Sequence, residues 1–477
     1  MRSFLHLRWL LTLLLGLGAL RSAQASHIRG GDVSYASTAP TTAGVPRYHV
    51  VVRQFVEPVT NGLITTTVPL VASRGCGATG TNTFTVTAPR TQLLDATTLT
   101  CGSTGPLYQV AVYEADLDLP AGQWLLSVTL NARTTSLLNL LNAPTQNCYL
   151  VAYLDNTLTT QDVSPVFQSL RQPYLNVAAF TPHNLSAFDA NGDSLRYEII
   201  QPLGACNQPL VAYPSTFVPH FAVDASTGLL TPTVAGISTI GGSYNITVKV
   251  SEYRRINGSW QLIGYVIRDT LYIPLPAINQ PPTFTTARVN GGAAQPVGLP
   301  IVVQPGQLVS VVLQATDPDA GQLLRFVGPA AGVVPGLSLA AGTMPGSAQL
   351  TWQVPASLPA GRYPILATVL DDGCIYNATE ERTLTFVVGG NAPLATRAGL
   401  NAATEVYPTP FREQVQFKTV PNQVVVLFDA LGREVARLTS APDGLVRWQP
   451  ASALPAGLYL ARSAADGQPL ARLLRAE

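Results

Sequence analysis

Two short acidic turns are the places where the residue types and their spacing could do chemistry. One runs from Asp189 through Asn191 to Asp193, and the other places Asp317 and Asp319 two residues apart. Clustered carboxylate and carbonyl oxygens are the ligands that hold Ca²⁺ in proteins. The same side chains also cap turns through hydrogen bonds to nearby backbone, which is a purely structural role. The residues alone leave both interpretations open.

Groups with the spacing of a catalytic site do not occur in the sequence. After the first 25 residues only His27, His49, His183 and His220 remain, and none lies in a His-Glu-x-x-His pattern. No Gly-x-Ser-x-Gly motif is present either. A carboxylate pair for glycoside hydrolysis can come from distant positions, so a secreted hydrolase stays open as a remote alternative. We predict that the protein is not an enzyme.

The composition favours an all-β fold. Only 12% of the residues are charged, whereas the chain holds 39 Gly and 38 Pro. Short strands separated by frequent turns fit this mixture, together with its many Val, Leu, Thr and Ala residues. The formal net charge of +1 argues against electrostatic capture of nucleic acid, which needs concentrated Lys and Arg on one face.

The first 25 residues have the pattern of a secretory signal peptide. Arg2 and Arg8 precede an apolar run over residues 9–20, and Ala23 and Ala25 form a small-x-small cleavage site. The run is too short to span a bilayer, which takes about 20 apolar residues. No later segment is long and apolar enough, so we expect no transmembrane segment after the leader is removed.

The middle of the chain resembles tandem cadherin-like or Ig-like β-sandwiches. Each of two modules, 161–278 and 279–389, has an acidic turn before a strand, and Phe221 to Gly228 matches a Phe-x-x-Asp-x-x-Thr-Gly turn. The resemblance implies that calcium is the one possible cofactor. It assigns as ligands Asp317, Asp319 and Asp371 in the third module, and Asp189 and Asn191 with Glu252 in the second. The segment before Pro281 supplies no carboxylate, unlike the cadherin linker, which implies weaker binding.

The first module, residues 26–160, is similar to the N-terminal region of large extracellular proteins that accompany bacterial gliding-motility proteins. Residues 27–35 and 101–153 carry this resemblance, and Asn131-Ala132-Arg133 stands where those relatives have further cysteines. The chain has five cysteines, an odd number, so at least one thiol is free or paired with another molecule. A bridge between Cys76 and Cys101 is our first prediction.

A tetrapeptide, Leu-Pro-Ala-Gly, recurs at Leu119, Leu358 and Leu454. An aromatic residue follows each copy, namely Trp124, Tyr363 and Tyr459. Proline presets the backbone and glycine tolerates a positive φ, so we expect a tight turn, then a strand whose aromatic residue packs on a neighbouring strand. Trp124, Trp260, Trp352 and Trp448 all fall in strand-like runs, and we expect all four in the core.

The last module, residues 405–477, carries an ordered series of motifs after a linker at 390–404. The series holds a Tyr-Pro-x-Pro opening, an Asp-x-x-Gly turn, a Gly-x-Tyr pair and a basic end, formed by Tyr407, Pro408, Pro410, Asp429, Gly432, Gly457, Tyr459, Arg472 and Arg475. That order resembles the type A C-terminal sorting domain of type IX secretion substrates. The resemblance implies that the translocon is a partner and that the protein is secreted or attached to the outer-membrane surface.

The expected function is that of an exported, non-enzymatic modular protein for adhesion, surface structure or display of an interaction face. Its other partner would be an unknown surface protein or glycan. The alternative is a carbohydrate- or calcium-dependent binding module protein. Exposed aromatic residues on one face of a module would favour carbohydrate binding, whereas aromatic residues buried in the core would not.

Overall fold

The computed structural model confirms the all-β fold class. In its described residues, strands β1 to β33 and two short 3-10 helices, η1 (Gly80–Asn82) and η2 (Ala143–Thr145), form the regular structure. The structure describes residues 28–56, 64–96, 108–131, 133–134, 137–171, 174–176, 182–210, 221–232, 242–275, 279–373, 377–389, 406–408, 410–429, 434–451, 454–464 and 469–476. The predicted leader and linker, Cys101 and Gly432 lie outside these residues.

The chain divides into two compact units, residues 1–390 and 391–477. This division falls at the start of the predicted linker. No helix in the described part of the chain is long and apolar enough to cross a membrane. Each unit has its own buried cluster of apolar side chains.

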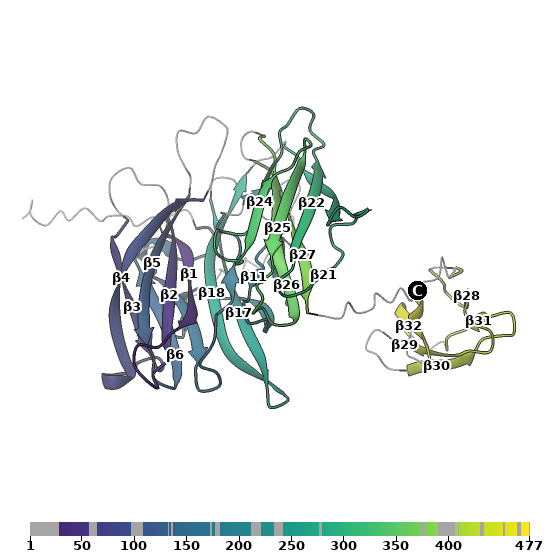
Figure 1. Cartoon of the computed structure of the whole chain (residues 1–477), viewed down its shortest axis with the longest axis horizontal. Helices are drawn as coiled ribbons and strands as arrows, with labels where there is room; N and C mark the ends of the chain where they lie inside the picture. Colours follow the sequence, from purple (N-terminus) through teal and green to yellow (C-terminus); the bar gives the residue numbers. More distant parts are fainter. Residues whose placement is uncertain are drawn as a thin grey trace, which may run out of the picture. The chain divides into compact units, whose positions relative to one another are not determined.

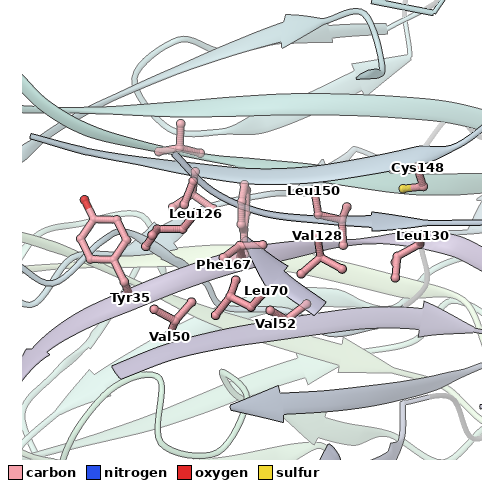
Figure 2. Packing of buried hydrophobic residues seen from close by; sticks show 14 of the residues in the cluster. Tyr35, Val50, Val52, Leu70, Leu126, Val128, Leu130, Cys148, Leu150 and Phe167 are labelled. Carbon is pink, nitrogen blue, oxygen red and sulfur yellow. The ribbon is translucent and has the colours of Figure 1, made fainter. Parts of the chain in front are cut away.

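Eight strands of the first unit form a closed ring, in which each strand pairs with its neighbours and the last returns to the first (Figure 1). In order around the ring these are β1 (Ile28–Thr38), β2 (Arg47–Val56), β5 (Gln109–Asp118), β4 (Thr83–Asp95), β3 (Thr67–Ser73), β6 (Gln123–Leu130), β7 (Cys148–Asp155) and β18 (Ser259–Leu275). Fully buried side chains such as Val50, Leu126 and Leu150 fill its interior (Figure 2).

The ring closes where Gly31 of β1 pairs with Asp269 of β18. Gly30 and Gly31 have φ values of +121° and +154°, which favour glycine over residues with a side chain. A Cβ on Gly30 would lie 2.1 Å from the Asp269 carbonyl oxygen, and one on Gly31 would lie 2.1 Å from that of Arg53. Gly30 therefore lets the backbone of β1 approach that of β18, and Gly31 lets it approach that of β2.

Buried ion pairs hold this closure. The Arg268 Nη2 atom of β18 lies 2.6 Å from Asp32 of β1, and both side chains are at most 4% exposed. On the next residue of β18, Asp269 accepts two hydrogen bonds from Arg133, at 2.9 and 2.6 Å. Removing one partner of a buried pair leaves an uncompensated charge and costs about 3–5 kcal/mol.

Strand β18 also belongs to the second predicted module. It pairs with β17 (Tyr244–Ile256), which pairs with β12 (Ser194–Ile200), so one sheet runs through residues on both sides of the predicted boundary at 160. One apolar cluster likewise includes Val50 from the first module and Val248 from the second. The smaller sheets of this region contain β8 (Val166–Phe167) with β11 (Ala187–Phe188), β13 (Leu203–Ala205) with β14 (Gln208–Pro209), and β10 (His183–Asn184) with β16 (Leu229–Pro232) and β15 (Phe221–Val223), while β9 (Tyr174–Asn176) runs parallel to β18.

Residues 279–389 form a sandwich of two sheets around a separate core. One sheet has the order β20 (Ala294–Gln295), β19 (Thr283–Val289), β22 (Leu308–Thr316), β25 (Ser347–Gln353) and β24 (Leu337–Ala341), and the other has β21 (Ile301–Val303), β27 (Thr379–Val388), β26 (Gly361–Leu370) and β23 (Arg325–Val327). Gln168 docks the preceding module on this sandwich, because its side chain donates to the Pro364 carbonyl at 2.9 Å and accepts from Leu366 N–H at 2.9 Å.

The second unit is a small arrangement of two sheets with its own core. One sheet pairs β28 (Val415–Lys418) with β31 (Leu445–Trp448), and the other has the order β30 (Glu434–Thr439), β29 (Val424–Phe428), β32 (Gly457–Ser463) and β33 (Pro469–Arg475). Phe411, Trp448 and Tyr459 pack together in its centre, with neighbouring ring centres 5.7 and 5.1 Å apart.

The three Leu-Pro-Ala-Gly copies share one geometry. The ring groups of Trp124, Tyr363 and Tyr459 donate hydrogen bonds to the proline carbonyl four residues earlier, at 2.9, 2.8 and 2.6 Å. All three rings are at most 2% exposed, and a strand follows each turn. The predicted structural role is therefore confirmed, although among the three glycines only Gly457 has a positive φ.

Two predictions about single residues are wrong. Cys76 bonds to Cys206, not to Cys101, because the β13–β14 hairpin folds back against the ring from 130 residues away. Closing a loop of that length can stabilise a fold by about 4–5 kcal/mol in the chain-entropy model. Trp260 is 61% exposed, whereas Trp124, Trp352 and Trp448 are buried as expected.

Substituting Gly30 with Ala tests the closure of the ring. The Cβ would meet the Asp269 carbonyl, and Ala disfavours the positive φ, so we expect Gly30→Ala to lower the free energy of unfolding by at least about 2 kcal/mol. Gly298→Ala is the matched control, since no atom lies within 4 Å of its added Cβ. Urea unfolding followed by circular dichroism measures both, and equal midpoints for the two variants would contradict the expectation.

Candidate functional site

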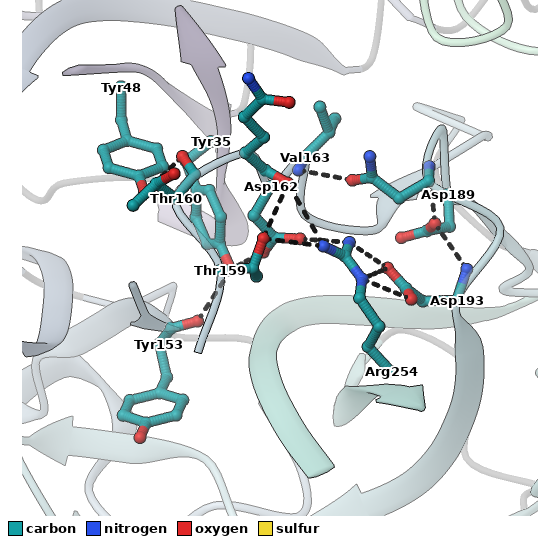
Figure 3. Close-up of polar contacts among 12 residues, drawn as sticks. Tyr35, Tyr48, Tyr153, Thr159, Thr160, Asp162, Val163, Asp189, Asp193 and Arg254 are labelled. Atoms are coloured by element: carbon teal, nitrogen blue, oxygen red, sulfur yellow. Dashed lines mark hydrogen bonds and ion pairs between the residues drawn. The ribbon is translucent and has the colours of Figure 1, made fainter. Parts of the chain in front are cut away.

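Four carboxylates from three segments lie close together near the end of β17, and we name them the acid cluster: Asp162, Asp189, Asp193 and Glu252. Figure 3 shows Asp162, Asp189 and Asp193 around Arg254. Oxygen atoms of Asp162, Asp193 and Glu252 lie within 4.8 Å of one another. Asp162 precedes β8, Asp189 and Asp193 flank the turn before β12, and Glu252 lies in β17. Of the residues described by the structure, no other His, Cys, Asp or Glu side chains form such a group of three.

Arg254 supplies the positive charge of this site. Its guanidinium donates to Asp162 Oδ1 at 2.7 Å and to Asp193 Oδ2 at 2.5 Å, both through Nη2. Its Nε donates to Asp193 Oδ1 at 2.8 Å. Burial lowers the pKa of Arg254, but its hydrogen bonds to Asp193 and the charge of Asp162 outweigh that effect and raise it. One guanidinium therefore offsets part of the charge of four carboxyl groups.

Three oxygen atoms of the acid cluster accept no hydrogen bond: Asp189 Oδ2 and both oxygens of Glu252. Asp189 is 4% exposed and Glu252 is fully buried. Burial raises the pKa of Asp189 to about 6, and burial with the charges of Asp189 and Asp162 raises the pKa of Glu252 well above its usual value. An unsatisfied buried carboxylate is costly, so these oxygens need either protons or a bound cation.

Asn191, a predicted ligand, has a different task. Its Oδ1 atom accepts a hydrogen bond from the Val163 N–H at 2.8 Å, while its own N–H donates to Asp189 Oδ1 at 2.9 Å. Asn191 therefore fixes the segment that carries Asp162 beside the turn that carries Asp189. Asp189 therefore does both things that the sequence left open: it caps a turn, and it lies in a cluster of carboxylates.

The three predicted ligands of the third module lie around Asn279 and Gln280. Asp371 Oδ2 accepts from the Asn279 side chain at 2.9 Å, and Asp319 Oδ2 accepts from the Gln280 N–H at 2.8 Å. Asp317 Oδ1 accepts from the Asp319 N–H at 2.7 Å, and its Oδ2 is buried without a partner. Amide groups of the protein therefore meet most of these oxygens, in contrast to the acid cluster.

Asp162, Asp193 and Arg254 are functional candidates that the sequence reasoning did not assign. A repeated offset could have indicated Asp162, since it precedes Phe167 by five residues just as Asn279 precedes Phe284. In space, Glu252 lies beside Asp162 as Asp371 lies beside Asn279. Gly373 leaves room for Asn279, whose side-chain nitrogen lies 2.2 Å from where a Cβ would be. One module thus balances its acids with a guanidinium and the other with amides.

A cleft of about 370 Å³ with both polar and apolar lining opens beside the acid cluster. Asp189 and Asp193 line it from one module, and Arg362, Thr383 and Thr385 line it from the next. This cleft gives solvent ions a path to the side of the cluster where Asp189 lies. It is bounded by strands β26 and β27, which Gln168 ties to the preceding module.

The predicted sorting residues fall into two groups in the second unit. Tyr407, Pro408, Pro410 and Arg472 are exposed, with Tyr407 at 70%. Tyr459 is buried, and Arg475 donates to the carbonyls of Ala451 and Leu454. The opening and closing motifs meet, because the Phe411 N–H donates to the Leu474 carbonyl at 2.9 Å and the Ala476 N–H to the Phe411 carbonyl at 2.7 Å. Asp429 follows β29 and is half-buried.

Comparisons with known proteins found likenesses only among solved structures, since no family model and no curated protein matches this chain. Mouse cadherin-23 EC22-24 is 13% identical over 60% of this chain and 80% of its own, with a TM-score of 0.17. Drosophila N-cadherin EC1-4 is 12% identical over 64% and 73%, with a TM-score of 0.23. The Ig1-2 module of the Drosophila receptor tyrosine phosphatase DLAR is 13% identical over 48% and 96%, with a TM-score of 0.19. At these TM-scores the likenesses carry no argument about this chain.

The raised pKa of Glu252 predicts a pH-dependent effect of Glu252→Gln. Because folding favours its protonated form, Glu252 stabilises the fold least at high pH, and this cost appears as pH rises above the unfolded value near 4.5. We expect Glu252→Gln to be more stable than the parent at pH 8 by roughly 1–3 kcal/mol, with the difference vanishing towards pH 4. Urea midpoints in the presence of EDTA measure this.

Asp224→Asn is the matched control. It removes the same charge as Glu252→Gln, but we expect its effect on stability to have the opposite sign. Hydrogen bonds from Ser226 and Thr227 lower the pKa of this exposed carboxyl to about 2. The Asp224 contribution is present above pH 4 and is lost as pH falls towards 2, so Asp224→Asn should be less stable than the parent at pH 8. A Glu252→Gln variant that loses stability equally at every pH would contradict the buried-acid account.

Proposed function

We propose that this chain is an exported, non-enzymatic modular protein that acts as an adhesion or interaction scaffold, secreted or held at the outer-membrane surface. We further propose that its C-terminal unit directs it through type IX secretion. The observation that carries the proposal is the separate compact unit 391–477, in which the ordered motif series resembling a sorting domain is folded. Tyr407 and Arg472 are exposed there and accessible to a translocon.

The build of the first unit supports a scaffold role. Besides Gln168, the His183 ring and the Asn184 N–H lie 2.7 and 2.6 Å from the Glu381 carboxylate of β27, and Phe188 packs on Tyr363 at 5.7 Å. These contacts join the second and third modules through buried polar groups, not through a bare linker. Burial raises the pKa of Glu381, but the charges of His183 and Arg171 outweigh that effect and lower it, so the carboxylate stays ionised. Such joints fix how a binding face is presented.

Removal of residues 391–477 tests the export part of the proposal. In a bacterium with a type IX secretion system, we expect the truncated chain to accumulate in the periplasm, because the translocon would find no sorting unit. Cell fractionation and surface labelling measure this. The matched control is a fusion of the leader and residues 391–477 to a periplasmic reporter protein, which should then reach the surface. Normal surface delivery of the truncated chain would refute the proposal.

Binding of Ca²⁺ is a second candidate function, favoured by the three unpartnered oxygens of the acid cluster. An all-oxygen donor set suits this hard cation, and the number of charges tunes its affinity. Asp189, Asp193 and Glu252 would hold the ion on the side of the cleft, and Arg254 would keep Asp162 and Asp193 in place. The ion would neutralise the buried carboxylates and thereby stabilise the junction of the modules.

Isothermal titration of the EDTA-treated chain with calcium tests this candidate. We expect a dissociation constant of about 10⁻⁴–10⁻³ M, as in extracellular modules, because Arg254 reduces the net negative charge. Glu252→Gln should remove most of the heat, whereas Asp317→Asn in the third module and the exposed Asp224→Asn should remove none. Absence of heat at millimolar calcium would exclude the site without affecting the export proposal.

A further inference from the structure

The outer surface of the sheet around β18 carries a group of aromatic side chains that no part of the acid cluster uses. Side chains alternate between the two faces of a strand, and in β17 Val248, Val250 and Arg254 point inward. Tyr253 and Arg255 therefore point outward, and their cross-strand partners share this face. We name the outward group the aromatic face: Tyr153, Tyr253, Trp260, Leu262 and Tyr265.

Stacking orders part of this face. The rings of Tyr153 and Tyr265 lie 5.2 Å apart with an angle of 19° between their planes. Lys249 Nζ lies 5.5 Å from the centre of the Tyr265 ring. In Figure 3 the ring of Tyr153 points away from the acid cluster. The two tyrosines thus present ring surfaces on the outside of the sheet, next to the hairpin that carries Trp260.

A β-bulge turns Trp260 and Leu262 to this side. The Asn257-Gly258 turn, with φ values of 50° and 83°, fixes Ile256 opposite Ser259. Farther along, Glu252 pairs with Gly264, and this register would place Trp260 opposite Ile256 on the inner face. The extra residue, Ile263, is fully buried and shifts the register so that Trp260 pairs with Arg255 and Leu262 with Tyr253. Bulges are a common device for re-aiming side chains at binding sites.

We propose that the aromatic face binds a neutral polysaccharide chain. This inference rests on the proposed extracellular role and names a partner for it. Trp and Tyr rings offer flat apolar surfaces that stack on the C–H faces of sugar rings, while polar groups beside them bond to hydroxyls. Gln123 and Arg255, which are both exposed, supply such groups on the same side of the sheet.

The charges beside the aromatic face favour a neutral ligand. Lys249 is paired with Glu198 at 2.5 Å, and Asp155 accepts hydrogen bonds from Gln123 at 3.0 Å and Thr157 at 3.0 Å. Arg255 donates to the Gly258 carbonyl at 3.2 Å. No cluster of like charges is therefore present in the described part of this surface to recognise an acidic or a basic partner.

A second protein surface fits this face less well. Its far end, at Tyr149, Val151 and Ile267, is already covered by the β13–β14 hairpin that the Cys76–Cys206 bridge holds. In the open part the exposed large apolar side chains are Trp260 at 61% and Leu262 at 38%, while Tyr153, Tyr253 and Tyr265 are partly buried. That is small beside the roughly 800 Å² that each partner buries in a stable protein pair.

Sedimentation of the purified chain with insoluble cellulose, chitin, xylan and curdlan tests the proposal. We expect at least one of these polymers to retain the chain in high salt. Trp260→Ala and Tyr253→Ala should each weaken this binding about tenfold, since one ring stacking contact contributes up to about 1.5 kcal/mol. Trp260→Phe should keep most of the binding because it keeps a ring. Leu323→Ala, which removes a side chain that is 73% exposed in the third module, should change nothing.

Four results would overturn the inference. The first three are retention by none of the four polymers, retention that Trp260→Ala leaves unchanged, and retention only by acidic polygalacturonate, added as a fifth polymer, with loss in salt. A concentration-dependent dimer in sedimentation velocity that Trp260→Ala abolishes would assign the face to a second copy of the chain and would also overturn it. Export depends on the other unit, so Trp260→Ala should reach the surface normally, which separates this test from the deletion test.

Discussion

Closure of the eight-stranded ring between β1 and β18 is the constraint on which the first unit depends. The backbones of these two strands approach only because Gly30 carries no side chain, and Gly31 allows an equally close contact between β1 and β2. Arg268 and Asp269, adjacent on β18, then each form a buried ion pair, with Asp32 and Arg133 respectively. Buried pairs add little net stability by themselves, but a wrong register would leave both unpaired. The ion pairs therefore act mainly to specify how the ring closes.

The acid cluster depends on the closed ring for its position. Glu252 and Arg254 lie on β17, which is placed by its pairing with β18, and Tyr35 of β1 donates to Asp162 at 3.1 Å. Strands of the ring therefore position carboxylates that belong to the second predicted module, residues 161–278. Burial raises the pKa of Asp162 to about 6 despite the opposing charge of Arg254. Burying these carboxyl groups close together is unfavourable, and they stay close because the surrounding strands hold them in place.

Local features of this fold could be predicted from the sequence, and distant pairings could not. The Leu-Pro-Ala-Gly turns are readable because Tyr363 bonds to a carbonyl four residues away. The all-β class likewise follows from composition, since many short turns favour strands. By contrast, the Cys76–Cys206 bridge spans 130 residues, and sequence spacing contains no information on which hairpin folds back. Asp189 and Glu252 were assigned only through a resemblance, and Arg254 was not assigned because the residues that carried that resemblance include no guanidinium.

Trp260 shows a subtler limit of sequence reasoning. Alternation along β18 correctly indicates a strand. One extra residue, Ile263, however, places Trp260 and Leu262, which lie between it and the hairpin turn, on the opposite face from the one that simple alternation predicts. A bulge of this kind leaves no clear mark in the residue types, because Ile is itself a favoured strand residue. The error is therefore one of face and not of secondary structure.

Strand β18 is shared by the ring and the second predicted module, and this sharing has a mechanical consequence. A string of independent sandwiches under tension lengthens one module at a time, since each can shear open without its neighbours. Here, extraction of β18 would open the ring and strip β17 of its partner in the same event. Residues 28–275 would then resist a pulling force as one element, with a single large extension step. A chain built in this way transmits load without yielding in stages.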